Sequence, residues 1–87
     1  MTRIYYSTHF IRKVKKLSPF DQSLLSSKID VFRTDSNNPK LKVHALTGKL
    51  RGYFSFSLDY SRRVIFVKPE KDTVLFVDVG SHDEVYR

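Results

Sequence analysis

Residues 53–67 read Tyr-Phe-Ser-Phe-Ser-Leu-Asp-Tyr-Ser-Arg-Arg-Val-Ile-Phe-Val, and this stretch decides the fold. Its apolar residues at 54, 56 and 58 alternate with polar ones, which predicts a strand with one buried face and one wet face. Asp59–Ser61 supplies turn residues. The run Arg63–Val67 is short and mostly apolar, as in a central strand. The stretch therefore predicts two consecutive strands joined by a short turn.

The sequence on either side extends this pattern. Pro69–Asp72 predicts a second turn, Thr73–Val79 a last strand, and Gly80 its end. Before the stretch, Gly48 and Gly52 punctuate a linker and are expected to serve the backbone conformation rather than chemistry.

The N-terminal part changes period. Residues 3–6 are rich in β-formers and predict an edge strand, after which Ser7 or Thr8 can cap a helix. Residues 9–17 have an apolar helical face, and Ser18-Pro19 ends this helix and begins a second one. In the second helix the apolar stripe consists of Leu25, Ile29 and Phe32, and residues 34–39 predict a loop.

The predicted element order is therefore β-α-α-β-β-β. Two helices followed by a meander of strands indicate the α+β class, with a helical hairpin packed on a small antiparallel sheet. A length of 87 residues predicts one domain spanning residues 1–87.

Composition narrows the function. There are no cysteines, no apolar run of about 18 residues and no signal-peptide core at the N-terminus, so we expect a cytoplasmic protein without disulfides or a membrane segment. The net charge is +7, and residues 1–52 carry eleven Lys and Arg against three Asp. Such a basic half suggests a polyanionic partner, either nucleic acid or an acidic protein, although a merely solvated surface is the alternative. The residues expected to contact RNA phosphates are Arg12, Lys13, Lys15, Lys16, Lys42, Lys49, Arg51 and Arg62.

Common site motifs are missing from the sequence. It has no phosphate-binding glycine loop, no dinucleotide fingerprint and no nucleophile elbow, and its three histidines are not spaced as a local metal site, so we expect neither a cofactor nor a metal. Polar residues near strand ends remain, among them His44, Asp59, Arg63, His82 and Tyr86. RNA can be cleaved without metal when a base activates the 2′-hydroxyl, an acid protonates the departing 5′-oxygen and a cation stabilises the phosphorane. Each of these side chains, taken alone, has an ordinary structural interpretation.

Three short motifs resemble the RelE/ParE superfamily of bacterial toxins, and within it the YafQ-like branch. Residues 44–53 resemble that branch's pattern His-x-Leu-x-Gly-x-x-x-Gly-Tyr, residues 63–66 resemble the Arg-hydrophobic-hydrophobic-aromatic strand of RelE toxins, and residues 80–86 resemble the C-terminal Gly-Ser/Thr-His-x-x-x-aromatic ending. The β-α-α-β-β-β order agrees with the family fold.

The resemblance implies a toxin of a toxin–antitoxin system that cleaves mRNA on the ribosome. It implies that His44 lies beside the substrate, that Arg63 holds the scissile phosphate, that His82 is the general acid and that Tyr86 stacks on or orients a base. Two positions depart from the family: Ser55 and Ser57 stand where RelE has lysines, and Asp59 is the nearest carboxylate to the turn where the YafQ branch has a His and an Asp. The general base is therefore left open.

The expected partners are mRNA, ribosomal RNA and an acidic antitoxin that folds on the toxin as a hetero-oligomer. Two alternatives stay open: a non-enzymatic toxin of the ParE kind that poisons DNA gyrase, and an inactive interaction module on the same scaffold.

Overall fold

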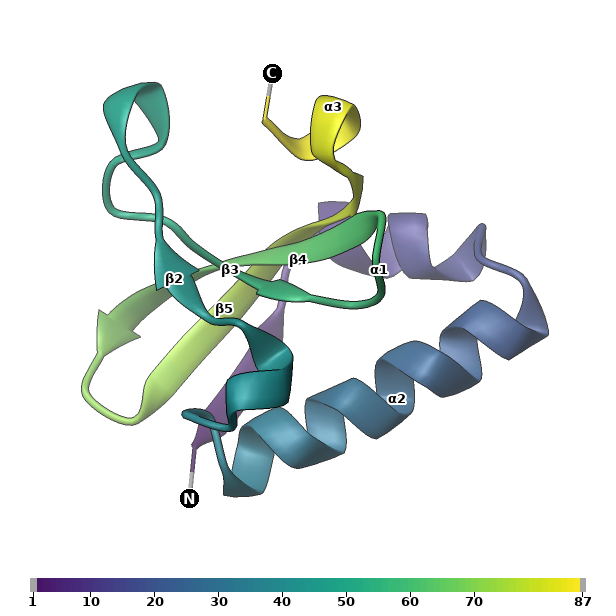
Figure 1. Ribbon diagram of the computed structural model, residues 1–87, viewed down its shortest axis with the longest axis horizontal. Helices are drawn as coiled ribbons and strands as arrows, with labels where there is room; N and C mark the ends of the chain where they lie inside the picture. Colours follow the sequence, from purple (N-terminus) through teal and green to yellow (C-terminus); the bar gives the residue numbers. More distant parts are fainter. Residues whose placement is uncertain (1, 87) are drawn as a thin grey trace.

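The protein contains a five-stranded sheet with the strand order β1-β5-β4-β3-β2. The computed structural model describes residues 2–86. Helix α2 lies across one face of the sheet, and the loop around residues 46–52 and the C-terminal helix α3 rise on the other side (Figure 1). The strands are β1 (Arg3–Tyr6), β2 (His44–Ala45), β3 (Phe54–Ser57), β4 (Arg62–Glu70) and β5 (Thr73–Ser81). The helices are α1 (Thr8–Lys15), α2 (Pro19–Thr34) and α3 (His82–Val85), with short 3₁₀ turns η1 (Pro39–Leu41) and η2 (Gly48–Leu50).

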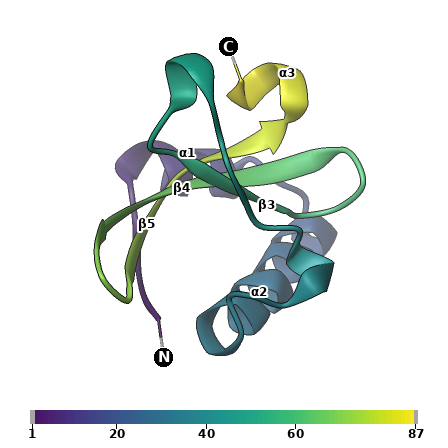
Figure 2. The same ribbon diagram turned by 60° about the vertical axis from the view of Figure 1, so that its left-hand side comes forward.

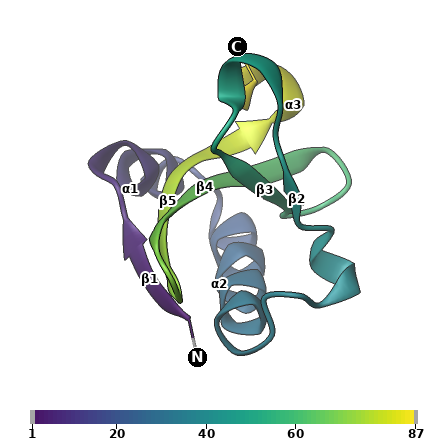
Figure 3. The same ribbon diagram turned by 90° about the vertical axis from the view of Figure 1, so that its left-hand side faces the viewer.

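The expected α+β class and the helical hairpin against a sheet are confirmed, but the sheet is mixed rather than antiparallel. Strand β1 pairs in parallel with the first half of β5, with Arg3 opposite Thr73 and Tyr6 opposite Phe76. These two strands lie side by side in Figure 3. Two helices and three strands separate them along the chain, so no tight hairpin forces them to be antiparallel.

The two long helices begin where the sequence predicts. The Ser7 hydroxyl accepts a hydrogen bond from the Phe10 backbone N–H at 3.0 Å, and the Ser18 hydroxyl accepts one from that of Asp21 at 3.1 Å. Pro19 occupies the first turn of α2, where its missing N–H costs nothing. The longest helix, α2, has 16 residues, and no helix within residues 2–86 has the length and apolar composition of a membrane span.

Aromatic side chains form the centre of the core between α2 and the sheet. Phe32 of α2 is fully buried and packs on Phe56, Phe66 and Phe76 from three different strands, with ring centroids 5.1, 5.1 and 5.6 Å away. Such contacts add to the hydrophobic gain of removing large rings from water. The predicted stripe of Leu25, Ile29 and Phe32 is buried as expected.

Several strand boundaries differ from the prediction. Pro69 lies inside β4 rather than in the turn, which consists of Lys71 and Asp72, and Asp72 adopts the left-handed conformation with φ of 60°. Strand β5 continues through Gly80 to Ser81. Ser55, expected on a wet face, is fully buried because β2, which the sequence pattern did not reveal, pairs with β3 and covers it.

Candidate active site

A cavity of about 420 Å³ lies on the face of the sheet opposite α2. It is placed between the loop 46–52 and α3, which stand beside each other in Figures 1 and 2. Four of the five catalytic candidates line it, namely His44, Arg63, His82 and Tyr86. The expected RNA contact Lys49 also lines it, as do Leu46, Thr47 and Leu50. The fold therefore brings together residues that are up to 42 positions apart in the chain.

Arg63 is directed to this face by the period of β4. It stands opposite Ser57 of β3 and Gly80 of β5, whereas its neighbour Arg62 is directed to the α2 face. The Arg63 Nη1 atom is buried and has no hydrogen-bond partner among residues 2–86. An unpaired buried donor on a cation is costly, so this guanidinium is suited to receive an anion from outside the chain.

Helix α3 begins with His82, and Tyr86 follows its last residue as the C-cap, four positions after His82. The rings are 4.4 Å apart at their centroids and nearly perpendicular, at 73°. A capping box begins the helix: the Ser81 hydroxyl accepts from the Glu84 N–H at 3.3 Å, and the Glu84 carboxylate accepts from the Ser81 N–H at 3.0 Å. The His82 side chain is 73% exposed, which leaves it accessible to substrate and solvent. The Tyr86 hydroxyl is buried without a hydrogen-bond partner in the part of the chain that the structure describes.

His44 enters the cavity from β2, whose pairing with β3 places it opposite Ser55. Its Nε2 lies 3.4 Å from the buried Ser55 hydroxyl, and its Nδ1 lies 3.2 Å from the backbone carbonyl of Lys42. A carbonyl oxygen can only accept, so a proton on Nδ1 satisfies this contact. Nε2 is then the acceptor nitrogen, and the Ser55 hydroxyl is its donor in this structure. The sequence analysis expected Ser55 on the wet face of a strand and as a departure from the family. Its contact with His44 depends on the unpredicted strand β2.

Asp59 lies outside this cavity. Its carboxylate accepts hydrogen bonds from the Ser61 and Arg62 N–H groups, at 3.1 and 2.8 Å, and forms an ion pair with the Arg62 guanidinium. The same guanidinium lies 2.8 Å from the Asp21 carboxylate at the start of α2. The hydrogen bonds from Arg62 lower the pKa of both carboxyl groups, and the two carboxylates raise the pKa of Arg62. Asp59 and Arg62, expected at the catalytic centre and on RNA respectively, are thus engaged with each other and with α2.

The other basic residues fall into two groups. The Lys13 ammonium lies 3.0 Å from the Asp78 carboxylate and is thereby partly neutralised. The remaining predicted RNA contacts are exposed: Arg12, Lys15, Lys16, Lys42, Lys49 and Arg51. Of these, Lys49 also lines the cavity. Within residues 2–86, no group of three or more His, Cys, Asp or Glu side chains gathers as metal ligands would.

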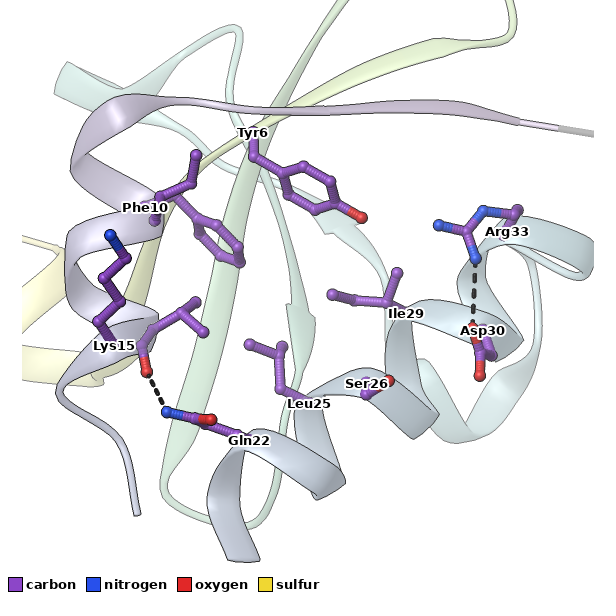
Figure 4. Close-up of a pocket in the computed structure, with 11 residues that line it drawn as sticks. Tyr6, Phe10, Lys15, Gln22, Leu25, Ser26, Ile29, Asp30 and Arg33 are labelled. Atoms are coloured by element: carbon purple, nitrogen blue, oxygen red, sulfur yellow. Dashed lines mark hydrogen bonds and ion pairs between the residues drawn. The ribbon is translucent and has the colours of Figure 1, made fainter. Parts of the chain in front are cut away.

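A second cavity, of about 410 Å³, lies between α1 and α2 (Figure 4). Phe10, Leu25 and Ile29 give it an apolar floor, and Lys15 and Arg33 lie at its rim. Arg33 is paired with Asp30 at 3.2 Å. The lining contains no histidine, whereas His44 and His82 line the first cavity.

Comparison with known proteins gives matches by structure only. Neither the models of known protein families nor the sequences of curated proteins match this chain. Among solved structures, a metal-bound toxin from Helicobacter pylori is 29% identical over 98% of this chain and 99% of its own, with a TM-score of 0.78. YafQ from Escherichia coli BL21(DE3) is 18% identical over the whole of both chains, with a TM-score of 0.82. The E. coli DinJ–YafQ toxin–antitoxin complex contains a chain that is 21% identical over the whole of both chains, with a TM-score of 0.78.

Proposed function

The chain has the fold of the RelE/ParE superfamily of toxins, and from this premise we propose that it is the toxin of a toxin–antitoxin pair and a metal-independent endoribonuclease that cleaves mRNA. One observation carries the enzymatic part. Arg63 and Tyr86 each hold a buried polar atom without a partner among residues 2–86, and both line the cavity that also contains His44 and His82. This combination places a cation in one cavity with two imidazoles that can accept and donate protons.

The proposed reaction is an internal transphosphorylation. His44 accepts the proton of the RNA 2′-hydroxyl at Nε2, and the 2′-oxygen attacks the adjacent phosphorus. His82 donates a proton to the departing 5′-oxygen as the P–O bond breaks. Arg63 stabilises the additional negative charge of the phosphorane that forms during the attack. The products are a 2′,3′-cyclic phosphate and a 5′-hydroxyl. Tyr86, against the His82 ring, offers an aromatic surface to a nucleobase.

We propose His44 rather than Asp59 as the base because of the positions of the two side chains. The Asp59 carboxylate is held by Arg62 outside the cavity. The His44 imidazole instead lines the cavity, and its Nδ1 contact with the Lys42 carbonyl orients the other ring nitrogen.

The proposed partners follow from charge. The exposed basic residues of α1 and the loop 46–52 would hold the RNA backbone in a sequence-independent manner, and the ribosome would present the mRNA. The proposed antitoxin is acidic, as the chain's net charge of +7 favours. The apolar cavity between α1 and α2, with its basic rim, offers an amphipathic acidic segment both an apolar floor and cations.

The test is cleavage of mRNA by wild-type protein and by the His82→Gln variant, with EDTA present. Gln fills a similar volume but cannot deliver a proton near pH 7, so we expect cleavage to fall by roughly 10²–10⁴-fold. His9→Gln is the matched control. His9 lies on α1 outside the cavity, and a Gln amide can keep its 3.1 Å contact with Asp78, so the variant should keep wild-type activity. Product ends should be a cyclic or 3′-phosphate and a 5′-hydroxyl.

The contrary outcomes are distinct. Wild-type cleavage retained in His82→Gln would refute the acid assignment. Intact mRNA together with inhibited DNA supercoiling by gyrase would refute the ribonuclease and favour a ParE-like toxin. Normal bacterial growth with soluble, folded protein expressed alone would refute the toxin role.

A further inference from the structure

Helix α3 is too short to be stable by itself. It has four residues, and isolated helices need about 12–15 residues to form appreciably in water. The capping box orders its first turn, and Val85 is buried beneath it. Because α3 begins with His82 and ends at its C-cap Tyr86, whatever fixes the helix to the sheet also fixes two proposed site residues.

Lys13 of α1 connects α3 to the last strand. Its Nζ lies 3.0 Å from Asp78 Oδ1 on β5 and 3.9 Å from Glu84 Oε2 on α3. The Lys13 side chain is only 24% exposed. Glu84 is also the residue that completes the capping box, so one carboxylate links the start of α3 to α1.

Gly80 provides the space for this contact. A Cβ atom at Gly80 would lie 3.1 Å from both Lys13 Nζ and Glu84 Oε1. Gly80 is outside the left-handed region, so its missing side chain serves space rather than backbone conformation. The ammonium and the carboxylate therefore meet directly over the strand residue that stands opposite Arg63.

We propose that Lys13 is a positioning residue that holds α3 against β5 and thereby sets His82 and Tyr86 at the cavity. The inference rests on the proposed function for its catalytic consequence. Lys13 belongs to the basic surface that the sequence assigns to RNA, but two carboxylates face its charge, and a phosphate would have to displace them. Lys13 thus acts through α3 and not on the substrate.

The first test is the Lys13→Met variant, which keeps the length of the side chain and removes its charge. We expect kcat to fall by about 10- to 100-fold at unchanged KM, since small misplacements of catalytic groups cost this much. Lys28→Met removes the same charge from α2, across the sheet, and should behave as wild type. Lys13→Arg, which keeps the charge, should recover part of the loss.

A double variant separates positioning from phosphate binding. If Lys13 acts through α3, then Lys13→Met should cause a much smaller loss in a His82→Gln background, where only its effect through Tyr86 remains. If Lys13 instead contacts phosphate, the two losses should multiply, KM should rise and the salt dependence of binding should weaken. That second result would overturn the proposal.

A readout without RNA keeps this inference separate from the proposed function. The His82 and Tyr86 rings shift each other's NMR signals because they lie 4.4 Å apart. In folded Lys13→Met these ring signals should move toward those of a mobile helix, and Gly80→Ala, which crowds the same contact, should move them too. Unchanged ring signals in both variants would overturn the positioning role, whether or not the wild-type protein cleaves RNA.

Discussion

Arg63 holds a buried polar atom that no described residue pairs. Its buried Nη1 atom lacks a hydrogen-bond partner within residues 2–86, whereas the adjacent Arg62 is bonded to two carboxylates. Strand periodicity places these two neighbours on opposite faces of β4. The same residue type therefore joins two carboxylates at position 62 and leaves a buried donor unpaired at position 63.

This difference yields a prediction for Arg63→Met. Because Met fills a similar space without a buried charge, the variant should unfold at the same or a higher temperature than the wild type. Its cleavage rate should nevertheless fall by roughly 10²–10³-fold, the usual effect of losing one preorganised donor. Thermal unfolding and kinetics on one preparation measure both quantities. Inorganic phosphate should raise the Tm of the wild type and not of the variant; equal stabilisation of both would place the anion elsewhere.

Tyr86 is separable into its ring and its hydroxyl. Tyr86→Phe removes a buried hydroxyl that has no partner in the described chain, so we expect undiminished stability and a mild effect on cleavage. Tyr86→Ala also removes the ring against His82 and should reduce cleavage severely. Side-by-side kinetics of the two variants provide the measurement. A severe loss in Tyr86→Phe would show that the hydroxyl itself contacts the reacting atoms.

Among the elements, the junction of α2 with the β3–β4 turn depends on pH. Arg62 joins Asp21 of α2 to Asp59 of the turn. Its hydrogen bonds lower the pKa of both carboxyl groups below their ordinary value of 3.8. A carboxyl group whose pKa is lowered by folding stabilises the folded state fully above its ordinary pKa, and this contribution is lost as the pH falls toward the lowered value.

Asp59→Asn tests this junction. At pH 7 the variant should be less stable than the wild type by about 1 kcal/mol or less, because the ion pair is partly exposed. Below about pH 4 the two unfolding curves should converge as Asp59 becomes protonated in the wild type. Urea unfolding between pH 7 and 2.5 measures the gap, and a gap that is independent of pH would mean that the charge of Asp59 contributes nothing. Cleavage at pH 7 should be retained, since Asp59 lies outside the cavity.

At the scale of the whole molecule, the positive charge is unevenly distributed. Residues 1–52 hold eleven of the sixteen Lys and Arg residues but only three of the nine acidic ones. The last turn of α1 contains Arg12, Lys13 and Lys15, and α1 packs against β5, the strand that leads into α3. A polyanion bound there would extend toward the candidate active site.

Replacing Arg12 and Lys16 together by Ala should weaken RNA binding and reduce the slope of log K against log salt by roughly 1.5. Each lost phosphate contact removes a little under one counterion from the balance. Binding measured between 50 and 200 mM salt gives the slope, and the double variant Lys28→Ala/Lys71→Ala controls for net charge. An unchanged slope would show that this face is solvated or reserved for a protein partner.

The local structure of this protein is legible in its sequence because its signals act over a few residues. The serine caps at 7 and 18, the apolar stripe of α2 and the alternation in β3 each predicted an element that the structure confirms. The capping-box pattern Ser81–Glu84 was also present, and it was the available signal for α3. The resemblance of residues 44–86 to known toxins further indicated which polar residues share a site.

Tertiary structure alone decided how those elements meet. Three features join residues that are distant in the chain. Strand β1 pairs in parallel with β5, the Ser55 hydroxyl is buried beside His44, and Lys13 and Arg62 form ion pairs with carboxylates. Because side chains alternate along a strand, the sequence predicts that Arg62 and Arg63 point to opposite faces of the sheet. It does not predict which of the two contacts Asp21. That choice depends on which face of the sheet the apolar stripe of α2 covers, because burying this stripe against the phenylalanines leaves the opposite face for the cavity.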